Sequence, residues 1–289
     1  MTVGGGFTLG ISGILSCLET DTGRLLWRKD FRGQFRETSP IYGAAMSPVV
    51  DGGLLIAHVG GHDDGALTAF DVATGNVKWA WKGDGPGYAS PVVADLGGRR
   101  QVVTQTQGHV VGVALEGGEL LWKIPLRTDY EQNAVTPVIH GQDVIYSGLG
   151  KGIHAVRIAK RAGGWVAEPQ WENLDLSMYM SSPVLDGDRL YGFSHRQKGQ
   201  AFCLDARTGK ALWTGPGRRG ENAALIRGGN ELFLLTTDAQ LLVARADAAE
   251  LAPLATYNVA GSPTWAQPVI LAGGILVKDA ETLALWQVE

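Results

Sequence analysis

A Pro-Val pair recurs along the chain at nearly regular intervals. It stands at Pro48-Val49, Pro91-Val92, Pro137-Val138, Pro183-Val184 and Pro268-Val269, usually after Ser or Thr. The first four copies are 43, 46 and 46 residues apart, and the last gap of 85 holds two repeats with a degraded copy at Ala224-Leu225. A period near 43 with short β-rich runs is typical of a β-propeller, one four-stranded blade per repeat.

Each repeat has the same internal order, which residues 182–213 show best. Strands are expected at 182–185, 190–193 and 200–204, followed by the turn Asp205-x-x-Thr208-Gly209 and a last strand that ends at Trp213. The Asp-x-x-Thr-Gly turn returns at 71–75 and, with Glu first, at 19–23. Its carboxylate can accept backbone N–H bonds and its glycine can adopt positive φ, so it predicts a hairpin between the two outer strands.

A tryptophan stands four residues after a glycine in most repeats. The set is Trp27, Trp79, Trp122 and Trp213, and Trp171 occupies the same place after a longer turn. An indole supplies a large apolar surface and one N–H donor. We therefore predict that these residues dock each blade on its neighbour; an aromatic surface for sugars or bases is the alternative.

The segment Ala69-Phe70-Asp71-x-x-Thr74-Gly75-x-x-x-Trp79 and its copies resemble the tryptophan-docking repeat of pyrroloquinoline-quinone-like (PQQ-like, quinoprotein-type) propellers. The resemblance covers essentially the whole chain. That family includes quinone-dependent alcohol and sugar dehydrogenases, a lipoprotein of the bacterial outer-membrane assembly machinery and many bacterial proteins without an assigned activity. It therefore implies a fold and leaves the function open.

The predicted fold is an all-β propeller of about seven four-stranded antiparallel blades in one domain, residues 1–289. Six repeats and a short three-stranded last unit are expected, at 2–31, 45–83, 89–126, 134–173, 181–217, 222–259 and 266–289. In the first, only Thr2-Val3 could form an inner strand. The alternative is a truncated eight-bladed propeller whose missing N-terminus would carry an export signal.

Charge and hydropathy limit the partners. The formal charge of −4 is spread without a Lys/Arg stripe, so nucleic acid is not expected. No apolar run is long enough for a transmembrane helix, and residues 1–20 lack a signal peptide. The family resemblance implies a periplasmic or secreted bacterial protein. We expect a monomer, with self-association through the incomplete end blades as the alternative.

The two cysteines fall at matching places in two repeats that are not neighbours. We expect Cys17 and Cys203 to be buried and not to form a disulfide, because equivalent positions on such blades are too far apart.

Two classes of loop would meet on one face of a propeller with this strand order. Those before the inner strands carry Tyr42, Tyr88, Asn133, Tyr179, Asn222 and Trp265; those between second and third strands carry His58, His62, Gln105, Gln107, Lys151, His195 and Arg196. Together they predict a polar funnel with aromatic walls, a composition typical of ligand pockets. In the alternative, the Tyr and Asn side chains only hydrogen-bond the entrances of the strands.

Three segments could hold an ion. His58, His62 and Asp63 could bind a divalent metal if residues 58–64 form a loop that wraps around it, and a plain solvated loop is the alternative. Residues 195–198, His-Arg-Gln-Lys, could hold an anion. The resemblance to quinone enzymes raises Glu221, Asn222 and Asp129 as calcium ligands, although turn caps explain them equally well.

We expect a non-catalytic binding or scaffold module for a protein or small molecule, without a cofactor. The first alternative is a dehydrogenase that uses PQQ and calcium. Against it, the chain lacks the adjacent cysteine pair of the family's enzymes and is shorter than they are. The second alternative is a metal-assisted hydrolase or lyase that uses His58 and His62. No nucleophile elbow or phosphate-binding loop is present.

Overall fold

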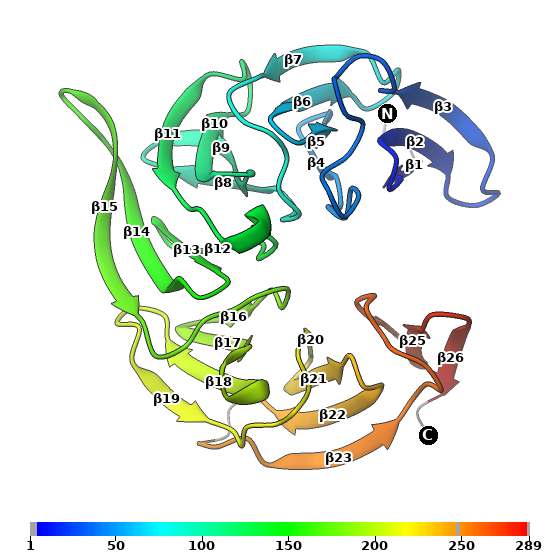
Figure 1. The fold of residues 1–289 in the computed structure, drawn as a ribbon, viewed down its shortest axis with the longest axis vertical. Coiled ribbons are helices and arrows are strands. Elements are labelled where there is room, and N and C mark those ends of the chain that lie inside the picture. The colour runs from blue at the N-terminus through cyan, green and yellow to red at the C-terminus, as the bar shows by residue number, and fades with distance from the viewer. Residues whose placement is uncertain (1–4, 247–248, 288–289) are drawn as a thin grey trace. The chain divides into compact units, whose positions relative to one another are not determined.

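The computed structural model describes residues 5–246 and 249–287, and within them almost all regular structure is β. Twenty-six strands form seven antiparallel sheets that follow one another in chain order (Figure 1). This confirms the predicted all-β propeller with seven blades.

Chain contacts divide the protein into two compact units, and each is described by itself. Unit 1 comprises Met1–Gly148 and Val156–Pro169; unit 2 comprises Leu149–Ala155 and Gln170–Glu289. The single domain over 1–289 stays a prediction.

The first three sheets belong to unit 1. Their strands are β1 (Gly5–Leu9), β2 (Ile14–Glu19) and β3 (Leu25–Asp30); β4 (Val49–Asp51), β5 (Leu54–Gly61), β6 (Asp64–Asp71) and β7 (Val77–Trp81); and β8 (Val92–Leu96), β9 (Arg99–Gln105), β10 (His109–Ala114) and β11 (Leu120–Pro125). A 3-10 turn, η1 (Asp129–Glu131), follows β11.

The fourth sheet contains residues of both units, and the last three sheets belong to unit 2. The fourth is β12 (Val138–His140), β13 (Asp143–Gly148), β14 (Gly152–Arg161) and β15 (Gly164–Asn173). The others are β16 (Val184–Asp186), β17 (Arg189–Ser194), β18 (Gln200–Asp205) and β19 (Ala211–Thr214); β20 (Ala223–Gly228), β21 (Glu231–Thr236), β22 (Gln240–Arg245) and β23 (Pro253–Asn258); and β24 (Val269–Leu271), β25 (Gly274–Lys278) and β26 (Leu283–Gln287). The 3-10 turn η2 (Arg196–Lys198) lies between β17 and β18.

The end sheets have three described strands each, and the other five sheets have four in sequential order. In the first sheet β3 carries Trp27, which marks it as the outermost strand, so β1 corresponds to the second strand of a complete blade. The expected inner strand at Thr2-Val3 lies outside the described residues. The last sheet contains the three strands that its short repeat predicts.

The Ser/Thr that precedes Pro-Val links neighbouring sheets of unit 1. The Ser47 N–H donates to Ser90 Oγ at 2.9 Å, and the Ser90 N–H donates to Thr136 Oγ1 at 3.2 Å. Each hydroxyl therefore satisfies the backbone donor of the equivalent residue one sheet earlier, at a point where the following proline offers no N–H.

Three of the five repeat tryptophans bond to the next sheet at equivalent points. Trp27, Trp79 and Trp171 donate their Nε1–H to the carbonyl that directly follows the third strand of that sheet, at 3.0, 2.7 and 2.9 Å; the acceptors are Val72, Leu115 and Ala206. Their rings lie on the turn glycines Gly75, Gly118 and Gly209, where a Cβ would approach ring carbons to 2.8, 2.6 and 2.3 Å.

The other two repeat tryptophans differ. Trp122 donates to Gln101 Oε1 of its own sheet at 2.7 Å. Between the third and fourth sheets, the packing tryptophan comes from the fourth sheet. Trp165 of β15 packs on Gly97 of the third sheet. At Trp213, the equivalent carbonyl of Ala246 accepts the Tyr191 hydroxyl, and Trp213 Nε1 is buried with no hydrogen-bond partner in the described part of the chain.

The core consists of interfaces between successive sheets. One cluster joins Ile56, Leu67 and Trp79 to Val102 and Val111 of the next sheet, and others follow in both units. The middle strands are therefore buried on both faces, as in β6, where every residue except the first and last is buried. The free thiols of Cys17 and Cys203 are buried in β2 and β18, and burial raises the pKa of both.

Candidate functional site

An open cavity of about 980 Å³ lies entirely within unit 2. We call it the unit-2 cavity; it is lined by Leu149, Tyr179, His195, Lys198, Arg218, Gly220, Glu221, Thr237, Asp238, Pro263 and Trp265. Its volume is in the range of small-ligand and peptide sites. Residues before inner strands and residues between second and third strands both contribute, so in this unit the two loop classes do line one space.

Two of its loops are held together by backbone bonds. The Arg218 N–H donates to Gln197 O at 2.9 Å, and the Arg219 N–H donates to Gly199 O at 3.2 Å. Gln197, Lys198 and Arg218 have φ of 57°, 60° and 63°, a region that non-glycine residues seldom occupy. Lys198 thus lies between two residues, Gln197 and Gly199, whose carbonyls are hydrogen-bonded to the other loop. These contacts hold Lys198 in an unfavourable backbone conformation.

The cavity is lined by charges of both signs. Lys198 and Arg218 are the cations, and Glu221 and Asp238 are the carboxylates; all four are exposed. None of these four side chains forms an ion pair with any residue that the structure describes. They are therefore available to a ligand.

His195 lies in the wall of the cavity in its neutral form. Burial, and then the charge of Arg196, lower the pKa of its imidazole. Its Nε2 accepts the Gly150 N–H at 3.4 Å, and its ring stands edge-on to Tyr179 at 6.4 Å between centroids. His195 thus contributes a polar, uncharged surface.

A smaller pocket of about 120 Å³ adjoins the cavity and shares Thr237 and Trp265 with it. We call it the side pocket; its remaining lining residues are Met180, Ser182, Asn222, Ala223, Ala224, Leu225, Thr264 and Gln267. Asn222 is 4% exposed, and its Oδ1 accepts the Met180 N–H at 3.2 Å. Its buried Nδ2 has no hydrogen-bond partner among the described residues.

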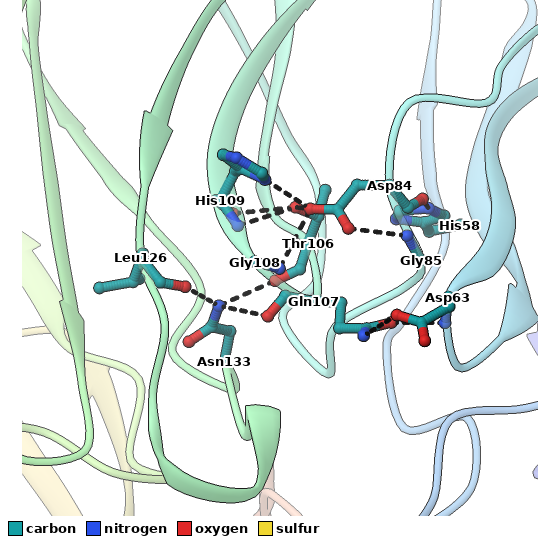
Figure 2. A network of polar contacts seen from close by, with 10 residues as sticks. All are labelled: His58, Asp63, Asp84, Gly85, Thr106, Gln107, Gly108, His109, Leu126 and Asn133. Atoms are coloured by element: carbon teal, nitrogen blue, oxygen red, sulfur yellow. Dashed lines mark hydrogen bonds and ion pairs between the residues drawn. The ribbon is translucent and has the colours of Figure 1, made fainter.

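Unit 1 contains a different polar cluster, centred on Asp84 (Figure 2). Asp84 Oδ2 accepts hydrogen bonds from Thr106 Oγ1 at 2.6 Å, His109 Nδ1 at 2.7 Å and the Gly108 N–H at 3.0 Å. Burial opposes ionisation of this carboxyl, but the three donors outweigh burial and lower its pKa. The cluster joins the β7–β8 segment to the β9–β10 turn.

The structure corrects the predicted metal loop. Residues 58–61 continue β5 and Asp64 begins β6, which leaves only His62-Asp63 as a turn. His58 is 2% exposed, its Nε2 lies 3.1 Å from Asp84 O, and burial lowers its pKa to about 4. His58 Nε2 faces Asp84 O whereas His62 Nδ1 faces Glu131 Oε2, so in the described structure the two imidazoles are turned to different partners.

His62 and Asp63 instead bond to other elements of unit 1. His62 Nδ1 lies 2.9 Å from Glu131 Oε2, and Asp63 Oδ1 accepts Gln107 Nε2 at 2.7 Å. Among the residues that the structure describes, no three His, Cys, Asp or Glu side chains are grouped to hold a metal.

Other predicted funnel residues of unit 1 have structural contacts. Asn133 is fully buried, and its Nδ2 donates to the carbonyls of Thr106, Gln107 and Leu126 (Figure 2). Gln105 Nε2 donates to Ser147 O at 2.8 Å. Both residues join neighbouring segments, and for Asn133 this is the kind of contact that the alternative for the strand entrances describes.

Tyr42 and Tyr88 lie together, with ring centroids 6.2 Å apart. Tyr88, His62 and Gln107 line a cleft of only about 10 Å³, which has room for about one water molecule. In unit 2, Lys151 and Arg196 are not among the residues that line the cavity. Of the predicted funnel residues, the unit-2 cavity collects Tyr179, His195 and Trp265, and its side pocket adds Asn222.

A family model described as outer membrane protein assembly factor BamB matches residues 4–215, which is most of the chain. The match covers the repeats that carry the docking tryptophans and turn glycines. The chain belongs to this BamB-like family of PQQ-like repeat proteins.

Its BamB-like relatives are longer than this chain. The outer membrane protein assembly factor BamB of Shewanella oneidensis is 25% identical over 206 residues, which are 67% of this chain and 50% of the relative. The chain therefore spans about half the length of that relative.

Two solved structures share the fold. BamB from Moraxella catarrhalis has a TM-score of 0.71 at 17% identity and covers 96% of this chain and 80% of its own. The quinohemoprotein alcohol dehydrogenase of Comamonas testosteroni has a TM-score of 0.65 at 14% identity, over 95% of this chain and 61% of its own. At these identities the likeness shows the fold alone.

The residues present do not fit a calcium-held quinone. Calcium takes six to eight oxygen ligands. Asn222 Oδ1 already accepts the Met180 backbone N–H. Among the described residues, Glu221 and Asp238 are the carboxylates that line the unit-2 cavity.

Sequence reasoning did not single out Arg218, Gly220 or Pro263, which all line the cavity. Arg218 and Gly220 lie in Gly215-Pro-Gly-Arg-Arg-Gly220, directly before an inner strand. A basic, glycine-rich segment in that place was the available signal. Within the described residues, no helix is long and apolar enough to cross a membrane.

Proposed function

We propose that this chain is a non-catalytic binding module that holds a segment of a protein partner in the unit-2 cavity. One observation carries the proposal: an open cavity with aromatic walls is lined by four charged side chains without ion-pair partners in the described structure. Exposed charges around an aromatic centre are typical of protein-binding surfaces. Its relatives are outer membrane protein assembly factors, which supports the same class of function.

We also propose, on the strength of the same relationship, that the protein works in the periplasm next to the outer membrane. The quinone dehydrogenase loses support because the carboxylates needed for calcium are not assembled around the cavity. The metal-assisted hydrolase loses support because His58 and His62 contact different partners in the described structure.

The test is a binding screen with overlapping peptides from outer-membrane proteins, using the wild-type chain and two variants. Glu221→Trp places a large ring in the cavity, and Glu250→Trp places the same ring on an exposed site of unit 2 outside the lining. We expect peptides that bind the wild type and Glu250→Trp and bind Glu221→Trp at least tenfold more weakly. Equal binding by both variants would place the site elsewhere.

A further inference from the structure

The two loops joined at the unit-2 cavity carry four cations, two of which line the cavity beside two carboxylates. Arg196, Lys198, Arg218 and Arg219 lie on the two loops joined by backbone bonds, whereas Glu221 and Asp238 are the carboxylates of the lining. Because the loop pair holds these like charges close together without a counter-ion in the described structure, a bound carboxylate would relieve their repulsion.

The side pocket supplies a second, independent indication of a ligand. Asn222 is buried, and the Met180 N–H assigns its Oδ1 as the acceptor, so the unpaired atom is the Nδ2 donor. A buried donor without a partner costs free energy until an acceptor reaches it. A carbonyl oxygen that enters the side pocket would supply that acceptor.

The walls of the side pocket indicate what accompanies this carbonyl. Met180, Ala223, Leu225 and Trp265 are apolar, and the volume of about 120 Å³ admits one small side chain. A backbone carbonyl next to a small apolar side chain fits these walls better than a charged group does, because a buried charge would have no counter-ion there.

We propose that the unit-2 cavity and its side pocket together bind an acidic peptide segment. The carboxylate of an Asp or Glu is bound by Lys198 and Arg218, and a main-chain carbonyl beside a small apolar residue accepts from Asn222 Nδ2. This rests on the proposed function and adds the chemistry of the ligand.

The experiment is calorimetric titration of the protein with a series of capped pentapeptides. Each contains one Val and one Asp, and the spacing between the two differs from peptide to peptide. The control series has the same peptides with Asn in place of Asp. We expect the best Asp peptide to bind at least tenfold more tightly than its Asn partner, and the difference to shrink as salt is raised. Equal affinity of the two would overturn the acidic specificity and leave the peptide-binding function standing. If the peptides of the outer-membrane screen also fail to bind, the proposed function itself falls.

Variants locate the two contacts. Lys198→Gln with Arg218→Gln should abolish the difference between the Asp and Asn peptides, and the matched control Lys210→Gln with Arg245→Gln, which removes two exposed cations outside the lining, should preserve it. Asn222→Asp keeps an oxygen that accepts the Met180 N–H and removes the Nδ2 donor. It should therefore weaken the binding of both the Asp and the Asn peptide. Should that variant not fold, nitrogen-15 spectra of the wild type decide: the Asn222 side-chain amide must shift on binding, and an unmoved signal contradicts its role.

Discussion

At the scale of single residues, each docked turn glycine meets two requirements at once. Gly75 has φ +67°, and Trp27 of the preceding sheet lies so close that a Cβ would stand 2.8 Å from its ring. The turn motif alone explains the first requirement. The second comes from the neighbouring blade and explains why the glycine and the tryptophan recur together.

Gly75→Ala should therefore lower the free energy of unfolding by more than an alanine substitution does at a glycine that has a positive φ and no close neighbour. Gly52→Ala is the matched control, since Gly52 has φ +56° and nothing lies within 4 Å of its missing Cβ. We expect a loss of about 1 to 2 kcal/mol for the control and about 3 kcal/mol or more for Gly75→Ala, measured by urea denaturation. Equal losses would mean that the indole moves aside without cost.

At the scale of elements, Asp84 joins segments that belong to successive sheets. Its carboxylate is bound by side-chain and backbone donors of the β9–β10 turn, and its carbonyl lies beside His58 of β5 (Figure 2). Hydrogen bonds to an ionised group are stronger than neutral ones. The cluster thus fixes the β7–β8 connection to the strands on both sides of it.

Asp84→Asn should cost about 2 to 3 kcal/mol at pH 7, because the charged acceptor of three donors is lost. The native pKa of Asp84 is lowered, so its stabilisation is complete above the unfolded value of about 3.9 and is lost as pH falls through the native pKa. When denaturation is followed from pH 7 to pH 3, the stabilities of the wild type and the variant should therefore differ by a constant amount down to about pH 3.9 and begin to converge below it. The control Asp95→Asn removes an exposed partner of Arg100 and should lower the free energy of unfolding by less than about 1 kcal/mol. A difference between the wild type and Asp84→Asn that stays constant at all pH values would count against an ionised Asp84.

At the scale of the whole molecule, one architecture serves relatives of different function. The fold of this chain is shared with an assembly factor and with an alcohol dehydrogenase. Sheet-to-sheet packing sets that architecture, whereas the loops of each protein determine which ligand it holds. Here the described loops of unit 2 present charged side chains without ion-pair partners, and no three His, Cys, Asp or Glu side chains among the described residues are grouped to hold a metal.

Addition of pyrroloquinoline quinone with calcium should produce no saturable one-to-one quenching of tryptophan fluorescence and no dye reduction with alcohols or sugars. The chain contains nine tryptophans, so quinone entry would be visible. A quinoprotein alcohol dehydrogenase serves as the positive control. Stoichiometric quenching followed by dye reduction would restore the enzyme alternative.

The strand pattern was predictable because its determinants are local. The Pro-Val pairs, the Asp-x-x-Thr-Gly turns and the tryptophan spacing predict the blades and place their boundaries within a few residues of the observed strands. The 58–64 segment shows the limit of this reasoning. Its glycines indicated a loop, but Gly60 and Gly61 pair with Gly65 and Asp64 as the end of a long hairpin.

The sequence by itself determined the repeat, the all-β propeller and its seven sheets, since turn chemistry and strand alternation act over a few residues. Only the tertiary structure decided which polar residues are used internally and which face a ligand. Asn133 and Asn222 precede inner strands in the same way, yet Asn133 finds three carbonyls for its amide and Asn222 finds none in the described residues. That difference depends on loops distant in sequence, and a pattern of neighbouring residues does not encode their approach.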